Sequence, residues 1–546
     1  MKTKNNPYIE HIMNEMGFVF SIIDREISSK TYGCADRTYW CWKFTDFPGA
    51  RFQEILYTLT WLYTYNSDKN KYYKNKILFE YIQAGFNYWT KIQNYNGSYN
   101  EAYPNENSLA ATAFTLFYIT ESFFLVQDNI CSDTKLNLIK SIDKASYWLC
   151  KNDETHAFLS NHLSAASAGL YNSFLVTNKK EYKSRYKYFL QKIISNQSEE
   201  GWYLEYGGAD PGYQTHCTFY LAVLFKKTKD LELLDSLKKA NEYLSYFIHP
   251  DSSIGGEYAS RNTSFFFPAA YEILKDDCEY SCAISQNQRI SIKNKNSIGI
   301  WQMDSFNFFP ILNNYIFASN AYELKVNCFS KVILPYLGKP FEQYFSHSGI
   351  FIKSTELYYA IVGGKKGGVI VVYNKKDKCC HYQSSGYIDK LGNNYISSQS
   401  QGISDAQLNN QSFTVKTPFS IINQKTFNPL LFIFFRLYNM TFSRMKSLSY
   451  LLKNLLVNKL VNKTKKLPIN LKRTFLFKSD SILVKDVVDG KITNNFKHIH
   501  KFTSFHMGSS RYASFNEIID KEKFDNNIKN VNDEIIHFGE IIFEKN

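Results

Sequence analysis

The stretch 109–126, LAATAFTLFYITESFFLV, decides the fold of this chain. Its apolar residues recur at three- and four-residue spacings, which is typical of an α-helix with a buried face. The same pattern occurs at 51–65 (RFQEILYTLTWLYTY), 164–177 (SAASAGLYNSFLVT) and 217–228 (CTFYLAVLFKKT). Between Ile9 and about Leu274 these segments arrive in pairs, separated by polar loops. Helical hairpins in series either close into an (α/α) toroid or stack as a solenoid, and the loops at one end build a cleft.

The pattern changes after about Gly338. Residues 348–376, SGIFIKSTELYYAIVGGKKGGVIVVYNKK, form short β-branched runs around a glycine-rich turn, and strand-like segments continue toward the C-terminus. We therefore expect an α+β multidomain chain with three parts. These are an N-terminal (α/α) toroid catalytic domain at 1–275, a linker with the remaining toroid helices at 276–337, and an antiparallel β-sandwich domain at 338–546.

The charge of the 546-residue chain is concentrated in one segment. The formal net charge is +14, and thirteen Lys or Arg with no Asp or Glu occur between Ala406 and Ser479. A nucleic-acid-binding protein usually spreads its charge over a face of the fold, so we expect no nucleic acid as a partner. A single basic segment indicates contact with an anionic surface instead.

A basic amphipathic insertion at about 427–467 interrupts the β region. In one interpretation it lies on the headgroups of an anionic membrane. In the other it packs its leucines on the toroid and leaves its lysines in water. The absence of acidic residues favours the membrane. The leucines that share one helical face are Leu448, Leu451, Leu452, Leu455 and Leu456.

The N-terminal segment MKTKNNPYIEHIMNEMGFVFSIIDRE predicts no signal peptide, because it lacks a continuous apolar region and a small-residue cleavage site. No apolar run of about 18 residues predicts a membrane-spanning helix. The ten cysteines include no CxxC pair and indicate reduced thiols. We expect a cytoplasmic protein, peripheral at the inner face of the plasma membrane.

The richest polar cluster combines residues 160–171 (SNHLSAASAGLY) with residues 199–222 (EEGWYLEYGGADPGYQTHCTFYLA). Asn161 and His162 head a helical run, where polar groups point into an end-on cleft. The glycine-rich GGADPG loop cannot be helical, so Tyr213 begins the next element. A single histidine is more often structural than catalytic, but this concentration at loop-to-helix positions indicates a site. Its other members are Glu205, Asp210 and His216.

A second polar set lies in CADRTYWCWKFTDFPGARFQE, residues 34–54. Aromatic rings beside Arg and Lys suit an acidic sugar, whereas the alternative is a buried ion-pair cluster at the end of the toroid. Two further loops add candidate substrate contacts. The substrate-binding candidates of these segments are Arg37, Trp40, Trp42, Lys43, Arg51, Tyr99, Arg261 and Asn262.

At these residues the chain resembles the heparinase II/III-like and alginate-lyase superfamily of polysaccharide lyases, which join an (α/α) toroid to an antiparallel β-sheet domain. The family's Asn-His pair resembles Asn161-His162, and its acidic-Gly stretch leading to a Tyr places the catalytic Tyr at Tyr213. The start of the family's sheet is similar to residues 347–369, which implies a second cleft histidine at His347. Here Glu200 stands where the family usually has Asp.

Residues 381–399 resemble the stretch in which some relatives bind a metal. The His and Asp set around His381 is incomplete, so we expect no cofactor and no metal site.

The resemblance implies removal of the C5 proton of a uronic acid residue in an acidic polysaccharide or lipid-linked glycan, during the making or editing of a surface polysaccharide. Asn161, His162 and Arg261 would bond the substrate carboxylate, and Tyr213 would be the general base or acid. His216 or His347 would stabilise the phenolate or serve as the opposing acid or base, and Glu205 would bind substrate. β-Elimination would make the chain a lyase, and reprotonation at C5 would make it a uronyl C5-epimerase.

Two other classes stay open. An inverting glycoside hydrolase on the same toroid would use two carboxylates as acid and base, chosen from Asp36, Glu101, Glu205 and Asp210. A non-catalytic glycan-binding or membrane-scaffolding protein would keep the cleft without turnover.

Overall fold

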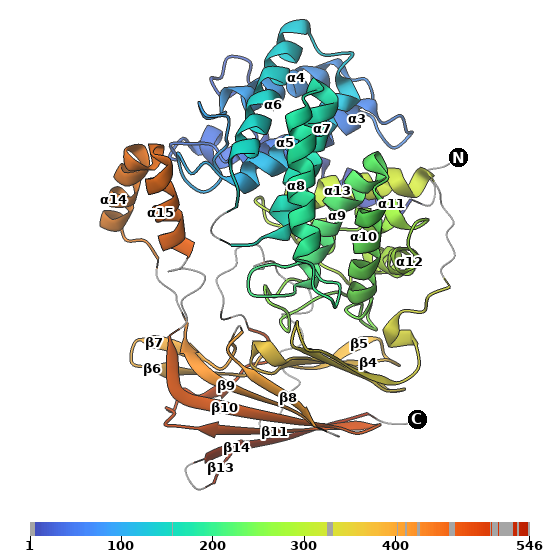
Figure 1. Cartoon of the computed structure of the whole chain (residues 1–546), viewed down its shortest axis with the longest axis vertical. Coiled ribbons are helices and arrows are strands. Elements are labelled where there is room, and N and C mark those ends of the chain that lie inside the picture. The colour runs from blue at the N-terminus through green and yellow to red at the C-terminus, as the bar shows by residue number, and fades with distance from the viewer. Residues whose placement is uncertain are drawn as a thin grey trace.

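The computed structural model of the chain joins a helical part to two β-sheets, with a short helical hairpin at one side (Figure 1). The expected α+β organisation, a toroid followed by an antiparallel sandwich, is confirmed. The structure describes residues 6–154, 157–324, 331–400, 402–409, 412–422, 426–457, 465–502, 504, 512, 528–531 and 534–543.

The helical part is a closed ring. Each inner helix packs against the next, and the last one, α13, returns to the first, α3. Buried hydrogen bonds close the ring, since Asn313 donates to the Glu54 carbonyl at 2.8 Å and accepts from the Thr58 hydroxyl at 2.7 Å. The inner helices are α3 (Ile55–Thr64), α5 (Leu109–Val126), α7 (Ser160–Thr177), α9 (Pro211–Thr228), α11 (Ala269–Leu274) and α13 (Phe308–Leu324).

The outer helices alternate with the inner ones along the chain. They bury one face against the ring and leave charged residues in water, as expected for surface helices. Two short helices at the N-terminus, α1 (Ile9–Asn14) and α2 (Met16–Ile22), precede the ring. The outer helices are α4 (Lys76–Lys91), α6 (Ser132–Lys151), α8 (Lys180–Ser195), α10 (Leu231–Ser245) and α12 (Glu279–Asn294).

Helix α5 is apolar on all sides because it lies inside the ring. Within the described part of the chain it is the one helix that is long and apolar enough to cross a membrane, and 83% of it is buried. Its neighbours α3 and α7 cover it instead of lipid. The core of the toroid therefore accounts for its composition.

The β part is a sandwich of two antiparallel sheets. Strand β3 is buried on both faces: Ala360 packs in the core between the sheets, while Ile361 packs against the toroid. The smaller sheet has the order β1 (Phe341–Phe345), β2 (Ile350–Ser354), β3 (Tyr358–Gly363), β4 (Val369–Asn374) and β5 (Cys379–Ser384).

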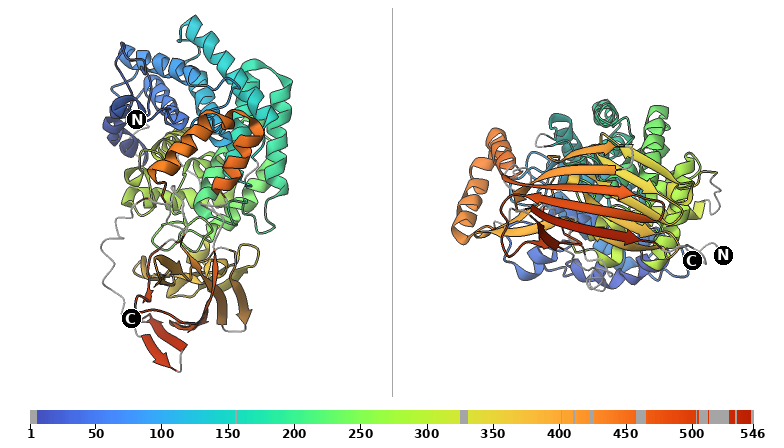
Figure 2. Two further views of the ribbon diagram at one scale, coloured as in Figure 1. Left: turned by 90° about the vertical axis from the view of Figure 1, so that its left-hand side faces the viewer. Right: turned by 90° about the horizontal axis from the view of Figure 1, so that it is seen from below.

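The larger sheet lies on the far side of the smaller one from the toroid (Figures 1 and 2). Its order is β12 (Lys497–His498), β6 (Tyr387–Leu391), β7 (Asn394–Ser397), β9 (Ser412–Ile421), β10 (Lys466–Phe477), β11 (Ser481–Asp489), β14 (Glu534–Ile542) and β13 (Ile528–Val531), with β8 (Asp405–Asn409) also paired to β9.

The basic insertion forms a helical hairpin of α14 (Pro429–Met440) and α15 (Lys446–Val457), drawn in orange in Figures 1 and 2. It leaves the large sheet and lies against the toroid. The leucine face expected on α15 is divided, because Leu451 and Leu455 are exposed and the other members are half-buried. The interpretation that the leucines pack together on the toroid is therefore wrong for these two. Of the lysines expected to face water, Lys459 lies outside the described residues.

Cysteine pairing also differs from the expectation. Cys282 in α12 is disulfide-bonded, whereas eight other described cysteines are free. The prediction of reduced thiols is therefore wrong for Cys282.

Candidate active site

Two neighbouring inner helices begin at the rim of the ring that lies beside the β domain. Asn161 is in the first turn of α7, and Tyr213 is in the first turn of α9. The Asp210 carboxylate caps α9 by accepting from the Tyr213 backbone N–H at 3.0 Å. Its second oxygen accepts from the Arg261 backbone N–H at 2.9 Å. One cap therefore brings Tyr213 and Arg261 together.

A buried carboxylate, Glu205, connects α7 to Arg261. It accepts from the Asn161 backbone N–H at 3.0 Å and from the Asn161 Nδ2 at 2.8 Å to each oxygen. Arg261 Nη1 donates to it at 3.2 Å. Burial raises the pKa of Glu205 to about 7, although Arg261 and Asn161 lower it. Its side chain is fully buried, so Glu205 positions its neighbours instead of contacting substrate as the sequence predicts.

The Arg261 guanidinium lies over the Tyr213 ring. The distance from its Cζ to the ring centroid is 3.4 Å, and the Tyr206 ring is 5.1 Å away on the same guanidinium. Both Arg261 and Tyr213 are more than nine-tenths buried. A cation at this distance in a desolvated site interacts strongly with an aromatic ring.

His162 projects from the same turn of α7 and is oriented by Glu154. Its Nδ1 lies 2.8 Å from Glu154 Oε2, and its ring meets the Phe114 ring edge-on at 5.5 Å. The Glu154 contact places Nδ1 of His162 at the carboxylate and orients the ring. No sequence motif marks Glu154, because it lies in a loop before α7.

His216 is buried among aromatic rings. It stacks on Phe267 at 4.2 Å and on Phe114 at 5.4 Å, and its Nε2 lies 3.1 Å from the Tyr220 hydroxyl. Burial lowers the pKa of His216 well below its ordinary value, and the nearby cations lower it further. A neutral imidazole supplies no positive charge, so the phenolate-stabilising role expected for His216 does not fit its surroundings.

Arg51 reaches the same aromatic group from the segment before α3. Its Cζ lies 4.6 Å from the centroid of Phe114, the ring that His162 and His216 also contact. It is paired with Glu54 at 2.8 Å and with Glu101 at 3.3 Å. The structure thus joins seven of the predicted site residues in one cluster: Asn161, His162, Tyr213, His216, Arg51, Glu205 and Arg261.

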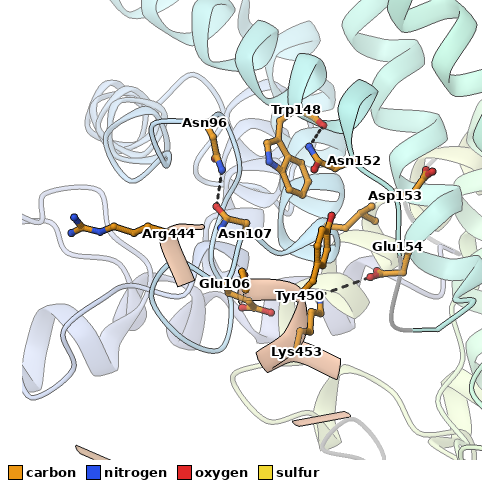
Figure 3. A pocket seen from close by; sticks show the side chains of 12 residues that line it. Asn96, Glu106, Asn107, Trp148, Asn152, Asp153, Glu154, Arg444, Tyr450 and Lys453 are labelled. Atoms are coloured by element: carbon orange, nitrogen blue, oxygen red, sulfur yellow. Dashed lines mark hydrogen bonds and ion pairs between the residues drawn. The ribbon is translucent and has the colours of Figure 1, made fainter. Parts of the chain in front are cut away.

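A pocket opens beside this cluster, between the toroid and the hairpin (Figure 3). It measures about 90 Å³ and is lined by side chains of both parts. Glu154 lies in its wall and pairs with Lys453 of α15 at 3.8 Å, in addition to its bond with His162. Other lining residues are Asn96, Glu106, Asn107, Trp148, Asn152, Asp153, Arg444 and Tyr450.

Other predicted substrate contacts lie elsewhere. Tyr99 is completely buried and stacks on Trp89 at 4.7 Å, so the prediction of a substrate contact there is wrong. Trp40 is half-buried and donates to the Ile22 carbonyl at 2.7 Å. Asn262 follows Arg261 and is buried in a left-handed conformation, with φ of 58°. The exposed ones, Arg37, Trp42 and Lys43, lie on the segment before α3.

His347 lies at the junction of the toroid and the small sheet. Its backbone N–H donates to Glu200 at 2.7 Å, and its carbonyl accepts from Lys365 at 2.7 Å. Its ring Nδ1 is 3.5 Å from the Ser198 hydroxyl. These contacts belong to the domain junction, whereas the cluster around Tyr213 uses other residues.

Among the residues that the structure describes, no group of three or more His, Cys, Asp or Glu side chains could hold a metal ion. His381 lies on β5, with its ring 4.8 Å from that of Phe543.

Comparison with known proteins identifies the fold. No family model matches the chain. No curated protein matches it in sequence. Solved structures do match, and they include the chondroitin AC lyase of Streptomyces coelicolor A3 in complex with chondroitin sulphate, with a TM-score of 0.55 and 8% identity over 89% of this chain. A Paenibacillus xanthan lyase matches with a TM-score of 0.52 and 10% identity over 88% of this chain.

These similarities concern the fold alone. The chain shares the fold of these two structures, and the helical toroid joined to an antiparallel β-sandwich, which the resemblance drawn from its sequence implies, is confirmed. It covers 66% of the chondroitin lyase chain and 45% of the xanthan lyase chain.

Proposed function

We propose that this chain is a carbohydrate-active enzyme of lyase type, which removes the C5 proton of a uronic acid residue in an acidic polysaccharide and cleaves the chain by β-elimination. The observation that carries the proposal is the Arg261 guanidinium over the ring of Tyr213, next to the Asn161–Glu205 pair. The fold supports it, since the matching structures are lyases of chondroitin and xanthan.

Tyr213 is the proposed base. A free tyrosine has a pKa of about 10, so its phenolate needs a stabilising charge near neutral pH. Arg261 supplies that charge from 3.4 Å. The phenolate takes the proton from C5, the electron pair of the C–H bond forms the C4–C5 double bond, and the C4–O4 bond breaks. The oxygen of the broken C4–O4 bond, which leaves with the neighbouring sugar, takes a proton either from Tyr213, which thereby passes on the C5 proton, or from His162, in which case Tyr213 keeps it.

The substrate carboxylate must be neutralised while charge develops on it. Both Nδ2 contacts of Asn161 go to Glu205, so in this arrangement Asn161 does not offer the substrate the donor expected from the sequence. In this proposal Arg261 supplies the positive charge that neutralises the substrate carboxylate, and His162 is the second hydrogen-bond donor.

The structure gives less support to a hydrolase. An inverting pair needs two carboxylates across an open cleft. Asp210 caps α9, and Asp36 accepts from the Gly49 N–H at 2.9 Å and the Thr38 N–H at 3.1 Å. Glu205 is enclosed by Asn161 and Arg261. These three carboxylates hold backbone or side chains in place.

Replacing Tyr213 with Phe tests the proposal, because it removes only the hydroxyl. Formation of the unsaturated product from uronate polymers, followed by ultraviolet absorbance, should fall by about 100-fold or more. Polymer binding should persist. Tyr203→Phe is the matched control, since this buried tyrosine lies on the loop before α9 and bonds Ser236 at 2.9 Å instead of contacting Arg261. Unchanged elimination in Tyr213→Phe would refute the proposal.

The same experiment separates a lyase from an epimerase. Incorporation of solvent deuterium at C5 without chain cleavage, lost in Tyr213→Phe, would identify a uronyl C5-epimerase with the same base. No turnover of any polymer in the wild-type chain would favour a glycan-binding protein.

A further inference from the structure

Helix α14 exposes a continuous apolar stripe. Leu430, Ile433, Phe434 and Leu437 have 69%, 53%, 69% and 57% of their surface exposed. Their spacing of three, four and seven residues places them on one helical face. The stripe extends along the hairpin through Phe442, Met445, Leu451 and Leu455, each more than half exposed. Exposed apolar surface of this extent on a folded protein marks an interaction site.

The opposite face of α14 is attached to the toroid. The Phe435 ring lies 5.3 Å from that of Tyr103, and Arg436 pairs with Asp46 at 3.1 Å. Asn105 donates to the Asn439 carbonyl at 2.9 Å. These contacts fix the rotation of α14, so its apolar stripe must point away from the toroid.

The charged residues around the hairpin indicate what kind of partner covers its apolar stripe. The segment from Ala406 to Ser479 has thirteen basic and no acidic residues. Arg444, at the turn of the hairpin, and Lys465 and Lys466, where the chain re-enters the sheet, are exposed. An apolar stripe flanked by cations and free of acids complements a bilayer with anionic headgroups. A protein partner would not require the complete exclusion of Asp and Glu.

We propose that the α14–α15 hairpin is an interfacial membrane anchor. The apolar stripe of α14 inserts between the headgroups of an anionic bilayer, and the adjacent Lys and Arg contact the lipid phosphates. This inference is independent of the proposed chemistry, since it rests on the hairpin alone.

Vesicle flotation of the full chain tests the anchor. Vesicles of phosphatidylcholine alone are compared with vesicles that contain phosphatidylglycerol, at low and high salt. The chain should float with the anionic vesicles, and the bound fraction should fall as salt rises. Ile433→Ser combined with Phe434→Ser should weaken binding by about tenfold or more. Because both side chains are exposed, the fold should persist, as circular dichroism can verify.

The matched control is Ile27→Ser combined with Phe306→Ser, which removes the same two residue types from exposed positions, 83% and 68%, outside the hairpin. It should bind as the wild type does. Lys465→Glu with Lys466→Glu should reduce binding to anionic vesicles only.

Equal binding to neutral and anionic vesicles would overturn the proposal, as would binding that survives Ile433→Ser with Phe434→Ser. Dimerisation of the wild type that this pair of substitutions abolishes, without vesicle binding, would assign the stripe to a second copy of the chain instead.

Discussion

Replacing Glu205 with Gln should change how the stability of the toroid depends on pH. Glu205 is fully buried between Asn161 and Arg261. Gln has the same shape and keeps one oxygen for the Asn161 donors, but it does not titrate. The comparison of the two proteins therefore isolates the ionisation of one carboxyl group.

The magnitude follows from the pKa of Glu205, which burial raises from 4.5 to about 7. Between these values the folded protein holds a proton that the unfolded chain has released, so stability falls as pH rises. One pH unit corresponds to about 1.4 kcal/mol. Over the interval from pH 4.5 to 7, the wild type should lose about 3 kcal/mol of unfolding free energy relative to Glu205→Gln.

Urea unfolding followed by tryptophan fluorescence measures this difference. All seven tryptophans lie between Trp40 and Trp301, so the signal reports on the toroid and not on the β domain. Glu199→Gln removes a charge from an exposed position of the same loop and serves as the control. The assignment of a buried carboxyl to this position would be refuted if the difference in unfolding free energy between wild type and Glu205→Gln did not change with pH. It would also be refuted if the wild type became relatively more stable as pH rises.

Three further substitutions test individual placements. Arg261→Lys should lower kcat about 30-fold, because a compact ammonium loses the planar contact with Tyr213, which is worth about 2 kcal/mol in a desolvated site. Elimination kinetics measure this kcat, and an unchanged value would contradict the role of the cation. Tyr99→Phe should leave activity unchanged and raise the unfolding free energy by about 1 kcal/mol in a urea titration, because the buried Tyr99 hydroxyl has no hydrogen-bond partner among the described residues. His347→Ala should change kcat by less than about threefold, because Glu200 accepts from its backbone and not from its ring; a loss as large as that of Tyr213→Phe would return His347 to the site.

The toroid could be predicted because its signal is local. The apolar spacing of α5, with polar loops on both sides, is sufficient for helical hairpins, and only the choice between a ring and a solenoid depends on distant contacts. The meeting of Asn161 and Tyr213 could also be inferred. Both lie in the first turn of an inner helix, and neighbouring inner helices present their first turns at the same rim.

The electrostatic partners could not be predicted. Arg261 reaches Tyr213 through a backbone bond to the Asp210 cap, and the sequence contains no sign of that bond. Tyr99 was expected on a loop surface, but its loop folds back onto Trp89. His216 shares a helical face with Tyr213 as the spacing indicates, yet its aromatic surroundings exclude the charge that its role required. The spacing of residues along a helix predicts which way their side chains point, whereas tertiary packing determines how polar the surroundings of each side chain are.

The way in which the ring closes has a consequence for how the protein is made. Helix α3 finds its second neighbour only when α13, which ends at Leu324, has left the ribosome. Until then Glu54 lacks the Asn313 contact, and Arg51, its ion-pair partner, lacks a fixed support. A nascent chain halted before α13 would expose the apolar flank of α3 and bind chaperones. The segment that carries Arg51 and Glu54 is therefore made early but reaches its native packing late.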